Sequence, residues 1–112
     1  MGGKASRDRG HRFERRMAEE FRNIGYTDCI TSRAGDKSMD EQGVDLLKTY
    51  PFNIQCKNYK QCVNYPQIFS EMPDDTNYNV ILSKVKRKGT YAILTLDDFL
   101  ELIGILREEQ II

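Results

Sequence analysis

The sequence predicts an α/β protein with a mixed central sheet flanked by helices, in the order α-β-β-β-α-β-β-α. Apolar residues recur at helical spacing near both ends of the chain. Short runs rich in β-branched and aromatic residues, bounded by turn residues, lie between them. At 112 residues the chain is expected to form one domain, residues 1–112, with residues 1–5 flexible.

The first helix is expected to begin at a cap provided by Ser6 or Asp8 and to run to about Asn23. Gly25 is a natural stop for this helix. One apolar stripe follows the helical period and consists of Phe13, Met17, Phe21 and Ile24.

A short strand is expected at about Cys29–Ser32, followed by a polar, mobile loop over Ala34–Gln42. The next two strands, at about Val44–Thr49 and Phe52–Asn58, form a predicted hairpin that turns at Tyr50-Pro51.

A short helix is predicted from Pro66 to about Glu71, because proline is favoured in a first helical turn. Strands are expected at Asn79–Lys84 and Thr90–Leu94. The last helix is capped by Thr95 or Asp97 and is expected to pack four residues inward: Phe99, Leu102, Ile103 and Leu106.

Composition limits the class of protein. No run approaches the ~18 apolar residues of a membrane span, so no membrane partner is expected. Three cysteines without a C-x-x-C pair fit a reducing compartment. We therefore expect a soluble protein of the cytoplasm of a bacterial or archaeal host, with virus-encoded origin as one option.

Net charge is zero, but the charges are segregated. Basic residues crowd residues 1–22 and 84–88, whereas the C-terminal segment is acidic. This pattern is typical of a phosphate-binding face, although charge runs are more often simply solvated. The candidate DNA contacts are Arg12, Arg15, Arg33, Lys60, Lys84, Lys86, Arg87 and Lys88.

Polar residues interrupt the predicted hairpin where a buried strand would be apolar. Side chains alternate along a strand, so Ile54 and Cys56 point one way while Gln55 and Lys57 point the other. Asp45 comes from the neighbouring strand, and a buried lysine needs such an anion or a ligand. An aspartate, an amide oxygen and a lysine on one face predict a metal and phosphate site.

The ordered set Glu14, Gly43-Val44-Asp45 and Gln55-Cys56-Lys57 resembles the PD-(D/E)XK nuclease superfamily. Within it, the small size and the run Gly10-His11-Arg12-Phe13-Glu14-Arg15 are similar to archaeal-type and phage Holliday junction resolvases. Segments 31–35 and 91–96 add to this similarity. The resemblance implies a restriction-endonuclease-like fold and covers nearly the whole chain.

Two positions depart from the pattern of the superfamily. Val44 stands where the signature has proline, a residue that shapes the turn and does no chemistry. Gln55 stands where most members have Asp or Glu, although Mrr-type restriction endonucleases are similar in using Gln-x-Lys. A glutamine oxygen can ligate a hard cation without adding negative charge, so weaker metal binding is expected.

The resemblance implies that Glu14, Asp45, Gln55 and Lys57 are catalytic. It places Mg²⁺, with Mn²⁺ as a substitute, on Asp45, the Gln55 side chain, the Cys56 carbonyl and Glu14, the last directly or through water. Lys57 would orient the attacking water or stabilise the transition state.

Each of these residues also has an ordinary structural interpretation. Asp45 could be an ordinary strand-end or turn aspartate, Lys57 a guard on an edge strand, and Glu14 a solvated helix residue. Arg33 could hold phosphate or pair with Asp36.

The favoured function is a Mg²⁺-dependent endodeoxyribonuclease that resolves four-way junctions in DNA recombination and repair. A homodimer is expected, because symmetric cleavage needs two sites related by a two-fold axis. Residues that could feed its interface are Phe69, Ile105, Ile111 and Ile112. The alternatives are another nuclease of this superfamily, acting on duplex or branched DNA, and an inactive DNA-binding module of the same fold.

Overall fold

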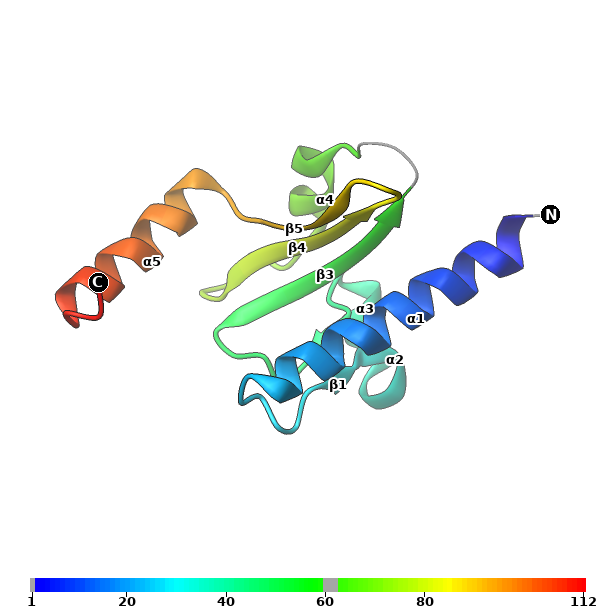
Figure 1. The fold of residues 1–112 in the computed structure, drawn as a ribbon, viewed down its shortest axis with the longest axis horizontal. Helices are drawn as coiled ribbons and strands as arrows, with labels where there is room; N and C mark the ends of the chain where they lie inside the picture. The colour runs from blue at the N-terminus through cyan, green and yellow to red at the C-terminus, as the bar shows by residue number, and fades with distance from the viewer. Residues whose placement is uncertain (1, 60–62) are drawn as a thin grey trace.

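The structure is a computed structural model that describes residues 2–59 and 63–112. It confirms an α/β protein with a mixed sheet of five strands and helices around it (Figure 1). The strands lie side by side in chain order: β1 (Ile30–Thr31), β2 (Leu46–Leu47), β3 (Phe52–Tyr59), β4 (Tyr78–Val85) and β5 (Gly89–Ile93). The helices are α1 (Gly2–Asn23), α2 (Ser32–Gly35), α3 (Lys37–Glu41), α4 (Tyr65–Glu71) and α5 (Leu96–Glu108).

The sheet contains one parallel pair, β3 with β4, while β1, β2 and β5 pair antiparallel with their neighbours. The parallel pair needs a crossover, and α4 lies in it. The predicted hairpin between β2 and β3 is present, and its turn is closed by the bond from Phe52 N to Thr49 O at 2.8 Å. The predicted strands agree with the structure to within two residues at each end.

The beginning of the chain differs from the prediction. Neither Ser6 nor Asp8 caps α1, because the helix already begins at Gly2. Residues 2–5, expected to be flexible, form its first turn. Arg9 Nη2 donates to Ser6 Oγ at 3.1 Å, so the serine hydroxyl serves as a side-chain partner one turn away.

The prediction of a polar loop over Ala34–Gln42 is wrong, because two short helices occupy most of it and add two elements to the expected order. Thr31 caps α2 by accepting from Ala34 N at 3.2 Å. Asp36 caps α3 by accepting from Ser38 N at 3.0 Å. Threonine and aspartate are strong N-caps, so local side-chain bonds hold helices here without an apolar stripe.

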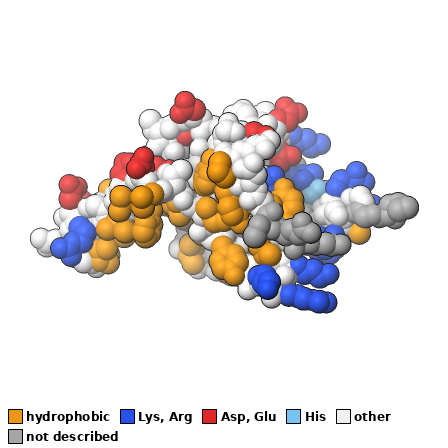
Figure 2. All heavy atoms as spheres, turned by 90° about the horizontal axis from the view of Figure 1, so that it is seen from above, with side chains coloured by type: hydrophobic (Ala, Val, Ile, Leu, Met, Phe, Trp, Pro, Cys, Tyr) orange, Lys and Arg blue, Asp and Glu red, His pale blue; other side chains and the backbone are white. Residues whose placement is uncertain are grey.

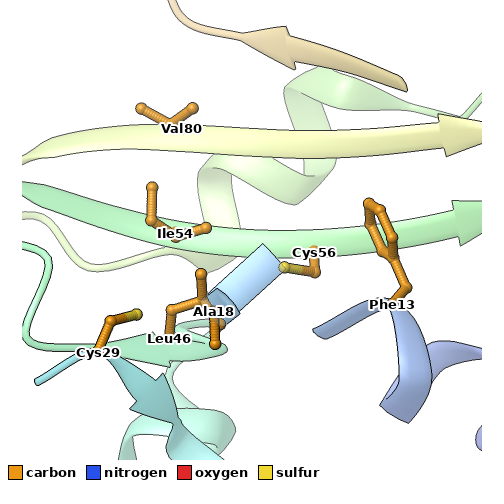
Figure 3. Packing of buried hydrophobic residues seen from close by; sticks show 7 residues of the cluster. All are labelled: Phe13, Ala18, Cys29, Leu46, Ile54, Cys56 and Val80. Carbon is orange, nitrogen blue, oxygen red and sulfur yellow. The ribbon is translucent and has the colours of Figure 1, made fainter. Parts of the chain in front are cut away.

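The core lies between α1 and one face of the sheet (Figure 3). Phe13 and Ala18 of α1 pack toward Ile54 and Cys56 of β3. Cys29, Leu46 and Val80 complete the buried cluster. The cluster thus confirms the face predicted for Ile54 and Cys56.

The opposite face of β3 carries Gln55 and Lys57, and α4 lies on that side, because its Ile68 and Glu71 line the same pocket as these two residues. The sheet therefore separates an apolar layer under α1 from a polar pocket under α4.

The predicted inward packing of α5 is wrong for the single chain. No residue of α5 is buried, and Figure 1 shows the helix extending away from the sheet. Phe99 is 51% exposed, whereas Leu102, Ile103 and Leu106 are only partly covered. Hydrophobic side chains gather along one side of this helix, with acidic ones beside them (Figure 2). The helical apolar period is present, but the described part of the sheet does not bury this face of α5.

Candidate functional site

Asp45 is held by β3 immediately before β2 begins. Its Oδ2 atom accepts from the backbone N–H of Cys56 at 2.7 Å and from Gln55 Nε2 at 3.0 Å. Its own backbone N–H donates to Ile54 O at 2.7 Å. Asp45 is only 4% exposed, so it is a buried carboxyl before a strand that accepts two hydrogen bonds, and not a solvated turn residue.

A pocket of about 220 Å³ opens beside this carboxyl. It brings together three of the predicted residues, Asp45, Gln55 and Lys57. Lys57 lies on β3, an inner strand of the sheet, but beyond the residue where β2 pairs with it, so at Lys57 only β4 is a neighbour. The remaining described lining residues are Asp40, Glu41, Gly43, Ile68 and Glu71. Four carboxyl groups and one lysine among these residues make the pocket strongly acidic.

Glu14 is also buried, with 8% of the residue exposed, so its interpretation as a solvated helix residue is wrong. The Arg33 guanidinium lies 3.7 Å from Glu14 Oε2, and this oxygen has no hydrogen-bond partner among the described residues. Burial raises the pKa of Glu14; the charge of Arg33 opposes the rise and that of Asp40 adds to it. Arg33 thus pairs with Glu14, whereas Asp36 caps α3.

Burial raises the pKa of Asp45 from 3.8 to about 7. The Cys56 N–H lowers it, whereas a hydrogen bond with Asp40 and the charges of Glu14 and Asp40 raise it further. The fold therefore holds carboxyl groups that repel one another when ionised. A cation would relieve this repulsion, and carboxylate oxygens suit Mg²⁺ or Mn²⁺.

The residues present thus fit a divalent cation in donor chemistry, with an orphaned oxygen on Glu14 and repulsion around Asp45. In the part of the chain that the structure describes, no group of three His, Cys, Asp or Glu side chains is arranged to hold a metal ion. Ligation by only two carboxylates, completed by amide, backbone or water oxygens, is compatible with this arrangement.

Gln55 presents its amide nitrogen, not its oxygen, to Asp45. Gly43, at φ +79°, leaves room for the Gln55 oxygen, which would lie 3.1 Å from a Cβ placed there. In this arrangement Gln55 positions Asp45. The ligand roles of the Gln55 oxygen and of the Cys56 carbonyl remain predictions.

Asp40 is the site residue that sequence reasoning missed. It lies in α3 and lines the pocket with Asp45. Ser32 Oγ donates to its Oδ1 at 3.5 Å. The available signal was the cap sequence Asp36–Ser38, which predicts a short helix and hence a defined position for Asp40.

Basic residues lie toward the end of the molecule where α1 begins (Figure 2). A larger groove of about 950 Å³ lies there between α1, the end of β3 and α4. Arg7 and Arg9 line it together with Lys57, so it leads to the acidic pocket. These two arginines were not among the predicted DNA contacts.

The predicted DNA contacts Arg12 and Arg15 are exposed on α1, and Lys86–Lys88 are exposed between β4 and β5. Lys84 is partly covered within β4. The turn lies at the same end of the sheet as the groove, because Lys86 N donates to Tyr59 O at 3.1 Å. Lys60, another predicted contact, lies outside the described residues.

No protein-family model, curated protein or solved structure matches this chain significantly. Among residues 2–59 and 63–112, none of the helices is long and apolar enough to cross a membrane.

Proposed function

We propose that this protein is a Mg²⁺-dependent DNA endonuclease of the PD-(D/E)XK type, with a restriction-endonuclease-like fold, that acts on four-way junctions. The observation that carries the proposal is the pocket in which Asp45, Gln55 and Lys57 meet, with buried Glu14 close enough to raise the pKa of Asp45. Buried ionisable groups of this kind are concentrated at functional sites.

Asp45 and Glu14 would hold Mg²⁺ or Mn²⁺, with the Gln55 oxygen or the Cys56 carbonyl as neutral ligands. Such a cation polarises the scissile phosphate and makes a bound water more acidic. The Cys56 N–H fixes the Asp45 carboxylate on the sheet. The Lys57 ammonium would offset the charge that develops on the phosphate.

DNA would approach along the groove that joins the basic part of α1 to the pocket. Arg7, Arg9 and Lys57 line this groove, and the basic turn Lys86–Lys88 lies at the same end of the sheet. Phosphate contacts of this kind supply affinity without sequence preference. Arg12, Arg15, Arg33, Lys60 and Lys84 would add to this surface.

A homodimer would provide the two cleavage sites that a four-way junction requires. Exposed apolar residues of α5 and of the segment after it support this part of the proposal: Phe99, Ile105, Ile111 and Ile112 are 51%, 44%, 67% and 59% exposed. Apolar surface of this kind is characteristic of contact sites. Phe69, on α4, is partly covered and lies outside this set.

Cleavage of a four-way junction in Mg²⁺ tests the proposal, with linear duplex and Y-form DNA as competing substrates. Parent protein should cut the junction, and Asp45→Asn should abolish cleavage while DNA binding persists. Asp28→Asn, an exposed aspartate outside the pocket, is the matched control and should cut like the parent. Cleavage of duplex and junction at equal rates would leave a general nuclease. DNA binding without cleavage by the parent would identify an inactive DNA-binding module.

A further inference from the structure

We propose that Asp40 supplies the second carboxylate that contacts the divalent cation beside Asp45, with Glu14 acting through a metal-bound water and Gln55 orienting Asp45. This inference rests on the proposed function and adds a ligand from α3 to it. In this inference a different element of the fold, α3, supplies the negative charge that Gln55 cannot provide.

Two backbone hydrogen bonds place the end of α3, and with it Asp40, near Asp45. Gly43 N donates to Asp40 O at 3.1 Å, and Val44 N donates to Met39 O at 2.9 Å. These two bonds join the end of α3 directly to the segment that leads into Asp45. The Asp40 and Asp45 side chains line the same pocket, and the charge of Asp40 raises the pKa of Asp45.

The charges in the described residues point to a cation. The only ion pair within 4.0 Å among them joins Arg33 to Glu14. Asp40 and Asp45 therefore face each other without a basic partner at salt-bridge distance. Glu14 is paired with Arg33 and does not line the pocket, whereas Asp40 and Asp45 both line it. Such a set of hard oxygen donors suits Mg²⁺ or Mn²⁺.

The hydrogen bonds assign different roles to the two polar partners of Asp45. Cys56 N and Gln55 Nε2 both donate to Oδ2, which leaves Oδ1 without either donor. In such a carboxylate, hydrogen-bond donors hold one oxygen in place. The other oxygen accepts from neither donor and is oriented to bind a metal ion. Gln55 is thus a positioning residue, and Asp40 is the ligand that adds charge.

The experiment is a calorimetric titration of Mn²⁺ into metal-free protein in the absence of DNA. Asp40→Asn should weaken binding at least about tenfold, the scale of loss expected when a metal site loses a supporting group. Asp28→Asn, at an exposed position outside the pocket, removes the same charge and should change affinity much less. Equal losses in the two variants would show a general charge effect and would overturn the inference.

A rescue variant separates a ligand from a structural residue. Gln55→Glu in the Asp40→Asn background returns one carboxylate to the pocket and should recover most of the lost Mn²⁺ affinity. Failure of rescue, with both variants folded by circular dichroism, would contradict the inference. If the parent binds Mn²⁺ and cleaves DNA but Asp40→Asn binds equally well, only the role of Asp40 fails. A parent that binds no Mn²⁺ would instead overturn the proposed function itself.

Discussion

Replacing Asp45 by Asn should stabilise the metal-free protein at neutral pH, although it removes the central residue of the proposed site. The carboxyl is buried and accepts from Cys56 N and Gln55 Nε2 at one oxygen. An asparagine oxygen can accept both bonds, while its NH₂ group can donate to Asp40. The variant therefore keeps the shape of the protonated aspartic acid and removes the cost of burying its charge.

The magnitude follows from the raised pKa of Asp45. Because the pKa is 3.8 in the unfolded reference and about 7 in the folded protein, the folded state binds more protons between these values. The contribution of the Asp45 carboxyl to stability is therefore present at low pH and is lost as pH rises from about 4 to 7. Each unit of pKa difference is worth about 1.4 kcal/mol, which gives roughly 4 kcal/mol at pH 8.

Urea unfolding in chelator between pH 4.5 and 8.5 measures this effect. The parent should lose about 2 to 3 kcal/mol between pH 5 and 8, whereas Asp45→Asn should show a much flatter profile. Added Mg²⁺ should restore stability to the parent at pH 8 and leave the variant unchanged, because a ligand stabilises only the state that binds it. Parallel pH profiles for the two proteins would refute the reasoning.

Three further predictions concern the metal, DNA and partner surfaces. Gln55→Glu should tighten Mn²⁺ binding in calorimetry and lower metal-free stability, because it adds a carboxylate beside Asp45; equal or weaker affinity would contradict this. Changing Lys86–Lys88 together to Ala should weaken junction and duplex binding and reduce the slope of log affinity against log salt by about 0.9 per lost phosphate contact. Mn²⁺ affinity should not change in that variant, and an unaltered slope would exclude the turn from the interface. Phe99→Glu with Ile105→Glu should convert a dimer to a folded monomer in analytical ultracentrifugation, and a monomeric parent would remove the junction resolvase proposal.

The strands and the pocket face were predictable because side-chain alternation is a local rule. Alternation along residues 54–57 correctly separated the core pair from the pocket pair. The burial of Glu14 could not be deduced from the helical stripe alone, since a charged residue beside Phe13 has no local reason to be covered. Only its order with Asp45 and Lys57 led to the prediction that Glu14 is a site residue.

The fold around residues 32–41 and the position of α5 were missed for different reasons. The two short helices depend on single capping bonds from Thr31 and Asp36, a weaker signal than an apolar period. For α5 the apolar period correctly predicted a helix, but the buried face that it also predicted is not found. It could not say which surface covers that face, because periodicity carries no information about tertiary or quaternary partners.

The sheet holds Asp45 and Gln55 in the pocket, whereas a short helix holds Asp40. Asp45 and Gln55 are fixed by the sheet through short bonds to neighbouring strands. Asp40 depends on α3, a helix of five residues whose cap, Asp36, is exposed. A helix this short gains little stability on its own, so the position of Asp40 relies on its cap and on bonds to the segment before β2.

Repulsion from Asp45 favours displacement of Asp40 in the metal-free protein, whereas a shared cation would favour its retention. Cation binding would therefore stabilise α3 as well as the carboxyl pair, and it would do so without moving the sheet that carries Lys57.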